Sequence, residues 1–118
     1  MDWPNAFTPR QEIVLATVKK ENIPHAIFVL SMGIIENKLL IGVCQMTTTL
    51  ENIKNNNKVV VIGKSDTGYY RIFGEAKIYS SGKYYKTVCE RSKPPLPKLA
   101  IVIDIKEVYD LDKAKRII

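Results

Sequence analysis

The chain alternates between short runs of apolar, β-branched or aromatic residues and short polar segments that contain glycine, asparagine or proline. Runs of the first kind favour extended strands, and the polar segments favour turns. Within the longest run, Tyr70 and Ile72 alternate with Arg71 and other charged residues, as in a strand with one exposed face. The pattern predicts six strands, at residues 13–18, 25–32, 39–43, 58–62, 69–79 and 99–105, the last of which can continue to residue 111.

Two segments have a helical pattern instead. In residues 47–55, Thr48 and Glu51 have the spacing of a capping box, and a run of asparagines closes the segment. Residues 83–91 form a second short helix that ends before Pro94, because prolines cannot continue a helix. Six strands, two short helices and tight connections predict a single all-β domain over residues 1–118, with the architecture of a small antiparallel barrel.

Composition limits the classes of partner. The 118 residues carry a formal net charge of +6, which favours anionic ligands such as phosphates and nucleotides. The lysines are interspersed with acids and form no basic tract, so we expect no nucleic-acid partner. The apolar runs are too short to span a bilayer and the first residues do not resemble a signal peptide. A cytoplasmic protein with no membrane partner is the resulting prediction.

The sequence gives little support for catalysis by the protein's own side chains without a cofactor. The only histidine, His25, and the two cysteines, Cys44 and Cys89, lack the spacing of a zinc site, so no metal is expected. The acidic residues show no pairing suited to general acid–base work, and neither common glycine-rich nucleotide loop occurs. The catalytic residues are therefore unknown from sequence.

The segment between residues 42 and 53 is the one local group of residues whose pattern suggests a ligand site. It joins a strand to a helix through Thr47, Thr48 and Thr49. A helix N-terminus presents unpaired amides and partial positive charge, and threonine hydroxyls add donors, so the junction is suited to a phosphate. The same threonines are also ordinary helix caps that need no ligand.

At this junction the chain resembles the FMN-binding split-barrel family, which is also described as pyridoxamine 5'-phosphate oxidase-like. A strand, a threonine-rich turn, a Leu-x-Asn-Ile helix, an asparagine-rich end and a valine strand follow one another, and a Gly-Glu-Ala strand comes next. The resemblance extends from about Ile13 to Leu111 and rests on residues 23–26, 39–47, 50–59, 70–76 and 95–103.

The resemblance implies a six-stranded antiparallel split β-barrel that forms a homodimer, with FMN in clefts between the subunits. The cofactor phosphate would lie near Met46, Thr47, Thr48 and Thr49. The isoalloxazine ring would lie against the backbone near Phe28, Val29, Val43, Cys44 and Gln45. Many relatives have a lysine at the position of Thr48. Lys64, Arg71 or a lysine of the second subunit would have to replace its charge.

The resemblance favours an FMN-dependent oxidoreductase or electron-transfer protein whose partner is a small molecule or a redox protein. In such a protein the flavin supplies the chemistry, which agrees with the lack of a catalytic triad. Two alternatives keep the barrel: a deazaflavin-dependent reductase, and a non-catalytic protein that binds or senses flavin. The physiological substrate does not follow from the fold, because one fold supports many functions.

Overall fold

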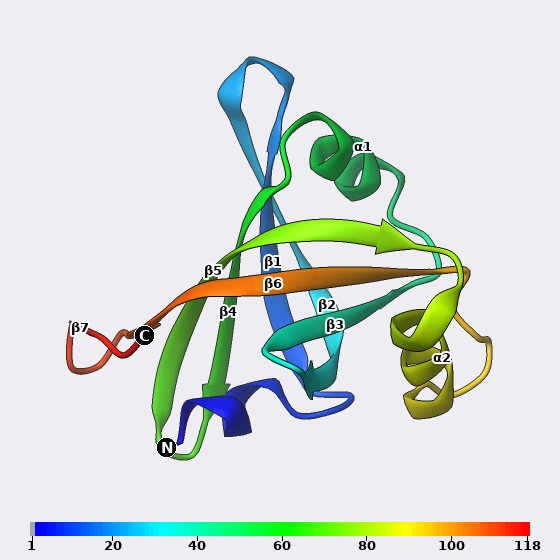
Figure 1. Ribbon diagram of the computed structural model, residues 1–118. Helices are drawn as coiled ribbons and strands as arrows, with labels where there is room; N and C mark the ends of the chain where they lie inside the picture. The colour runs from blue at the N-terminus through cyan, green and yellow to red at the C-terminus, as the bar shows by residue number, and fades with distance from the viewer. Residues whose placement is uncertain (1) are drawn as a thin grey trace.

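The computed structural model describes residues 2–118 and has the predicted order of strands and helices. Its elements (Figure 1) are η1 (Trp3–Phe7), β1 (Glu12–Lys19), η2 (Lys20–Asn22), β2 (Ile23–Ile35), β3 (Lys38–Val43), α1 (Thr47–Asn55), β4 (Lys58–Ser65), β5 (Gly68–Tyr79), α2 (Gly82–Arg91), β6 (Leu99–Asp110) and β7 (Lys115–Arg116). The sequence pattern predicts neither the 3-10 helix η1 nor the two-residue strand β7, because both are too short to show a period.

The six long strands form one antiparallel sheet that closes on itself. Neighbouring strands follow the order β3-β2-β1-β4-β5-β6, and β3 also pairs with β6. This last ladder runs from Lys38 opposite Asp104 to Val43 opposite Leu99. Closure leaves the barrel without a free sheet edge between β3 and β6. The six-stranded antiparallel barrel predicted from sequence is thus confirmed.

Alternate residues of each strand point into the barrel. In β1, Ile13, Leu15 and Thr17 are buried, while the residues between them are partly exposed. η1 packs against β2, β4 and β5 and adds Trp3 and Phe7 to the same core. The interior is filled by these side chains and by Val29, Leu39, Ile41, Val43, Val59, Val61, Ile72, Ile101 and Ile103. A ligand site is therefore expected on the outer surface.

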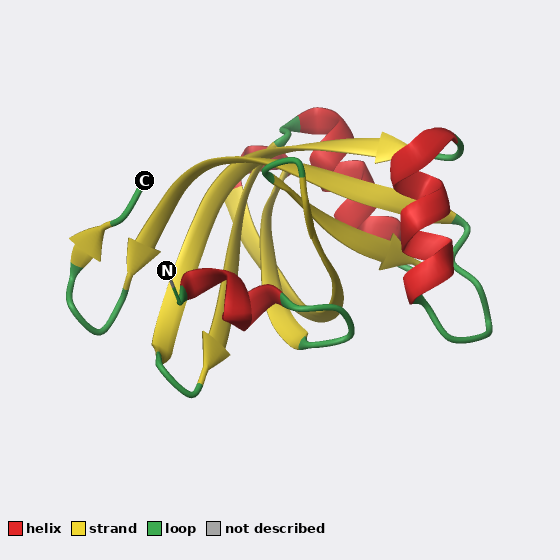
Figure 2. Ribbon diagram, turned by 60° about the horizontal axis from the view of Figure 1, so that its bottom comes forward, coloured by secondary structure: helices red, strands yellow, loops and turns green. Residues whose placement is uncertain are grey.

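The helix α2 covers part of that outer surface. It packs against β3, β5 and β6, and Figure 2 shows it beside the ends of the strands. Its Val88 forms a second buried cluster with Met32 and Leu40, together with Ala100 and Val102. These strand residues alternate with the interior ones, so they lie on the outside of the sheet. α2 thereby fixes the position of the chain that follows it.

The start of α1 differs from the sequence prediction. The helix begins at Thr47 with Met46 as its N-cap residue, and no side chain donates or accepts a cap hydrogen bond there. The predicted capping box of Thr48 and Glu51 is wrong, because Thr48 lies inside the first helical turn rather than before it. The predicted end of the helix at Asn55 is correct.

Among residues 2–118, no helix combines the length and the apolar character that crossing a membrane requires.

Candidate functional site

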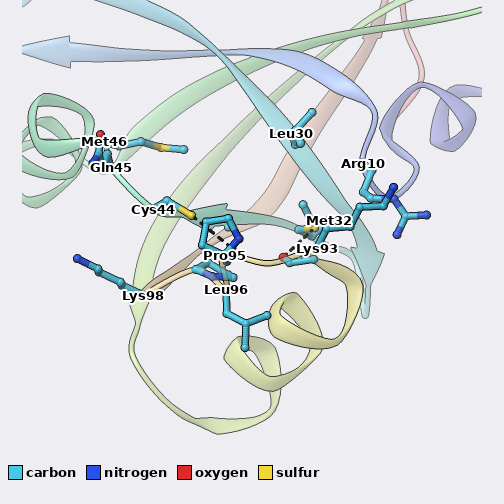
Figure 3. A pocket seen from close by; sticks show the side chains of 13 residues that line it. Arg10, Leu30, Met32, Cys44, Gln45, Met46, Lys93, Pro95, Leu96 and Lys98 are labelled. Atoms are coloured by element: carbon cyan, nitrogen blue, oxygen red, sulfur yellow. Dashed lines mark hydrogen bonds between the residues drawn. The ribbon is translucent and has the colours of Figure 1, made fainter.

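A pocket of about 680 Å³ lies on the outside of the barrel, beside the ends of β2 and β3. β2 supplies Leu30 and Met32. β3 and the residues after it supply Gly42, Cys44, Gln45 and Met46. The opposite side is formed by residues of the segment 92–98, which follows α2 and which we call the pocket wall (Figure 3). The pocket thus joins parts of the chain that are distant in sequence.

Hydrogen bonds to β3 and to α2 hold the pocket wall in place. The backbone N–H of Lys98 donates to the carbonyl of Val43 at 2.8 Å, which continues the β3–β6 ladder. The Tyr85 hydroxyl of α2 donates to the carbonyl of Pro97 at 2.9 Å. Gly42 permits the approach, since a Cβ there would lie 3.1 Å from Val88 and 3.3 Å from Pro97. The wall is therefore fixed from both the strand and the helix.

The acid–base state of Tyr85 supports this bond. The neighbouring Cys89 side chain, one helical turn along α2, raises the pKa of Tyr85, and partial burial acts in the same direction. Below that raised pKa the hydroxyl keeps its proton and remains a donor to the Pro97 carbonyl.

The N-terminus of α1 adjoins the pocket at Met46. The first hydrogen bond of the helix runs from the Leu50 N–H to the Met46 carbonyl at 2.9 Å. The N–H groups of Thr47, Thr48 and Thr49 precede it and have no acceptor within the helix. The side chains of Thr47 and Thr48 are exposed, whereas Thr49 is only 1% exposed. The helix end therefore offers amides and two hydroxyls to an anion.

The structure groups most of the residues that the resemblance assigned to a flavin. Cys44, Gln45 and Met46 line the pocket, and the three threonines follow them at the α1 N-terminus. Phe28 lies on the outer side of β2, 72% exposed, two residues before the pocket residue Leu30. Val29 and Val43 point into the core, so only their backbone is available to a ligand outside the barrel. The assignment of these residues to a flavin stays a prediction.

Several pocket residues were missed by the sequence argument. They are the cations Arg10, Lys93 and Lys98 and the apolar side chains Leu30, Met32 and Leu96. Lys98 could have been found only from the pairing of β3 with β6, which places it beside Cys44. Arg10 lies in the loop before β1 and carries no periodic signal.

The two compensating cations suggested from sequence lie elsewhere in this chain. Lys64 lies over the ring of Tyr69 at 5.8 Å, and the Arg71 guanidinium lies over Tyr109 at 4.7 Å. Neither lines the pocket, and the β4–β5 hairpin that carries them is at the opposite end of the molecule from α1 (Figure 1). Within one chain, Lys98 is the pocket cation on the same side as Gln45 and Met46 (Figure 3).

The remaining titratable candidates do not assemble into a catalytic group. His25 faces the barrel side of β2 opposite Thr17, and its enclosed Nδ1 has no hydrogen-bond partner within residues 2–118. Cys44 is exposed in the pocket, and Cys89 lies partly covered on α2. The described part of the chain contains no cluster of histidine, cysteine and acidic side chains that would hold a metal.

These features fit a flavin mononucleotide in outline. The pocket combines apolar side chains such as Met32 and Leu96 with cations, as a planar ring system with a phosphate requires. The uncapped amides of α1 suit the phosphate, and Lys98 supplies a positive charge on that side. A bound flavin would supply electron or hydride transfer, while the protein would hold and orient it.

The closed six-stranded barrel with two short helices is that of the FMN-binding split barrels. The sequence profile described as "Pyridoxamine 5'-phosphate oxidase" matches residues 5–112. The chain therefore belongs to the pyridoxamine 5'-phosphate oxidase family. No protein of curated function is significantly similar to it in sequence.

Solved structures with similar folds come from several differently named proteins. HupZ of Group A Streptococcus is 18% identical, with a TM-score of 0.85 over 99% of this chain and 98% of its own. An FMN-binding protein from Syntrophomonas wolfei is 17% identical, with a TM-score of 0.75 over 93% and 82%. A protein named F420 reductase is 19% identical, with a TM-score of 0.70 over 88% and 93%. At these identities the likeness establishes the fold alone.

Proposed function

We propose that the chain is an FMN-binding flavoprotein that acts as an oxidoreductase or electron-transfer protein. The observation that carries this proposal is the uncapped N-terminus of α1 at one side of a mixed apolar and cationic pocket. Helix N-termini bind phosphates through free amides and the helix dipole. Family membership and a fold shared with a protein named for FMN binding support the same cofactor.

Different residues of the pocket would bind the phosphate and the ring system of the flavin. The amides and hydroxyls of Thr47 and Thr48 would receive the phosphate, with Lys98 in support. The backbone around Cys44 and Gln45 and the apolar side chains of the pocket would position the ring system and reduce its contact with water. The described lining of the pocket includes no histidine and no carboxylate.

The proposal includes a homodimer with flavin at the subunit interface. Three adjacent strands carry outward apolar residues in register, because Phe28 of β2 pairs with Val14 of β1, which pairs with Ile62 of β4. Phe28 and Ile62 are exposed in the single chain. Leu30 lies on the same side of β2 and lines the pocket, so a second copy on this apolar face would border the site. This packing would also bury apolar surface that one small barrel leaves in water.

The first experiment is an absorption spectrum of the freshly purified protein, followed by mass spectrometry of any small molecule released on denaturation. Oxidised-flavin bands and released FMN are the expected result. A colourless protein is then titrated with FMN and with riboflavin, and tighter binding of FMN is expected because of its phosphate. Absence of flavin in both experiments would refute the proposal.

A deazaflavin is the second candidate cofactor, and it is favoured by the fold shared with a protein named F420 reductase. Titration with coenzyme F420 under the same conditions separates the two cofactors. A protein that binds flavin but shows no turnover with added electron donors would favour the alternative of a non-catalytic protein that binds or senses flavin.

We also propose a cytoplasmic location and no nucleic-acid or membrane partner.

A further inference from the structure

A second cavity, of about 350 Å³, lies at the end of the barrel where η1 meets the β6–β7 hairpin. We call it the β7 cavity, and its lining consists of Asp2, Trp3, Tyr70, Asp110, Lys113, Lys115, Arg116 and Ile117. It shares no lining residue with the pocket proposed for flavin. Figures 1 and 2 show β7 on the opposite side of the barrel from α2, beside which the flavin pocket lies.

The indole of Trp3 brings a buried donor without an acceptor to the β7 cavity. Trp3 is 6% exposed, and its Nε1 is one of two enclosed polar side-chain atoms that find no partner within residues 2–118. The Phe7 ring packs edge-on against the indole, with 6.3 Å between the ring centroids, and limits its rotation. Buried donors are nearly always paired in folded proteins, because an unpaired donor has lost its hydrogen bonds to water. We therefore expect the acceptor to come from a molecule in the cavity that Trp3 lines.

Asp110 adds a carboxylate from the end of β6. It is 8% exposed and lies directly opposite Tyr70 in the β5–β6 ladder. Its Oδ1 accepts a hydrogen bond of 3.0 Å from the backbone N–H of Lys113, which closes the turn before β7. No lysine or arginine of residues 2–118 forms an ion pair with this carboxylate. A carboxylate has two acceptor oxygens, so Asp110 can also accept a hydrogen bond from a ligand.

The β6–β7 hairpin places positive charge at the mouth of the same cavity. Lys113, Lys115 and Arg116 line the cavity and are exposed to solvent. The Arg116 Nε donates to the Ile118 carbonyl at 2.7 Å and lies 3.7 Å from the Glu107 carboxylate, which orients the guanidinium. Exposed cations also occur elsewhere on this chain. The buried indole donor and the buried carboxylate behind these three distinguish the β7 cavity.

We propose that the β7 cavity binds a nucleotide, with the base inside and the phosphate at the mouth. The edges of nucleotide bases present N–H donors together with ring-nitrogen or carbonyl acceptors. An acceptor of the base would pair with the Trp3 indole N–H, and an N–H donor of the base would pair with Asp110. The phosphate would receive charge-assisted hydrogen bonds from the cations of the hairpin. This site is separate from the flavin pocket and does not depend on the proposed function.

The first test is an NMR titration of the full chain with AMP, GMP, CMP and UMP, with and without saturating FMN. The chain contains a single tryptophan, so the indole N–H of Trp3 gives one unambiguous signal. We expect this signal and the amide signals of Asp110 and Lys113 to shift with at least one monophosphate. In the presence of FMN, the amide signals of Cys44 and Met46 should stay unchanged. An indole signal that shifts with none of the four monophosphates would overturn the proposal.

Fragments of the monophosphate that binds best distinguish a nucleotide site from a site for any anion. The corresponding nucleoside lacks the phosphate, and ribose 5-phosphate lacks the base. Each fragment should bind about tenfold or more weakly than the monophosphate, because each lacks one set of hydrogen bonds. Ribose 5-phosphate that bound as tightly as the monophosphate would show an anion site without base recognition and would overturn the proposal.

Two substitutions test the buried part of the cavity, with affinities measured by calorimetry. Asp110→Asn keeps an acceptor for the Lys113 N–H but removes the negative charge, and it should weaken nucleoside and monophosphate alike by about tenfold. Trp3→Phe keeps an aromatic ring but removes the donor, and it should weaken both ligands by about threefold to tenfold. Unchanged affinities in both variants would contradict recognition of the base.

The cations of the hairpin are tested by the double variant Lys113→Gln, Lys115→Gln. Both lysines are exposed, so the fold should be retained. The variant should lose affinity for the monophosphate by about tenfold and keep its affinity for the nucleoside. The matched control is Lys19→Gln, Lys20→Gln, two equally exposed lysines at the tip of the β1–β2 hairpin, and it should bind as the unaltered chain does. Equal loss in the two double variants would show general charge attraction and would overturn the phosphate site.

Discussion

The Asn52 side-chain amide donates a hydrogen bond of 2.9 Å to the Thr17 hydroxyl, and both residues are buried. This bond connects α1 to β1 beneath the helix. It acts together with Ile53, which packs into the barrel core. Because the N-terminus of α1 adjoins the pocket, the bond contributes to the position of the threonine amides as well as to stability.

Replacement of Asn52 by alanine should therefore destabilise the fold. The Thr17 hydroxyl would lose its partner in a buried environment, at a cost of about 1–3 kcal/mol in the free energy of unfolding. Denaturant unfolding measures the change. The exposed Asn55 at the end of the same helix provides the control, and Asn55→Ala should have a much smaller effect. Equal effects of the two substitutions would contradict the structural role of the bond.

Charge at position 48 should tune phosphate binding. Thr48→Lys adds a cation to the first turn of α1 and should tighten FMN binding by about twofold to fivefold. Thr48→Glu should weaken FMN binding by a similar factor. Quenching of flavin fluorescence measures both affinities, with riboflavin as the control ligand that lacks the phosphate. If riboflavin affinity changed in parallel with FMN affinity, the phosphate would lie elsewhere. Position 48 suits this test better than Thr49, whose buried side chain would perturb packing.

A charge at Phe28 should break the proposed dimer. Phe28 is 72% exposed at one end of an apolar row with Val14 and Ile62. Phe28→Glu would place a carboxylate in the interface and shift the chain from dimer to monomer, as measured by light scattering after size-exclusion chromatography. Ile118→Glu adds the same charge at an exposed apolar residue near the chain end and should leave the mass unchanged. A monomeric unaltered chain would refute the dimer itself.

Loss of the Tyr85 hydroxyl should loosen the pocket wall. Tyr85→Phe removes the hydrogen bond to the Pro97 carbonyl, and we expect ligand affinity to fall by roughly threefold to tenfold. Tyr69→Phe, at an exposed ring outside the pocket, is the matched control. Unchanged affinity in Tyr85→Phe would show that the wall is held without this bond.

The same residue makes a prediction about alkaline pH. The pKa of Tyr85 is raised in the folded chain, so its protonated form is favoured by folding. Its contribution to stability is complete below the unfolded pKa of about 10 and is lost as pH rises through the higher folded value. Thermal unfolding between neutral and strongly alkaline pH should therefore show a steeper loss of Tm in the unaltered chain than in Tyr85→Phe. Parallel curves would contradict the shift.

The strands could be predicted from sequence because each one buries alternate residues. β1 and β5 show this directly, since the buried residues Ile13 and Leu15 of β1, and Tyr70 and Ile72 of β5, alternate with less buried ones. The helix start could not be placed, because Thr48 and Glu51 match a capping box that the structure does not form. The backbone enters α1 at Met46, a residue whose side chain makes no cap hydrogen bond, so no capping signal in the sequence marks that register.

The candidate site was predictable only on one side. Cys44, Gln45 and Met46 follow β3 in the chain, so the resemblance could assign them. Arg10 and Lys93 come from loops that the strand pattern does not place, and they reach the pocket through the packing of α2 and the turn before β1. Such residues depend on contacts between distant segments, which a single sequence does not reveal.

The pairing of β3 with β6 has a consequence for the order of folding. The two sides of the pocket, Cys44 and the wall at Lys98, are brought together by this ladder between distant parts of the chain. During synthesis β3 emerges well before its partner, so no ligand can bind until the barrel is nearly complete. Long-range pairings of this kind form slowly. A ligand present at one hundred times its Kd would then stabilise the closed barrel by about 2.7 kcal/mol. Because the ligand binds only after β3 and β6 have paired, this stabilisation favours closure of the barrel.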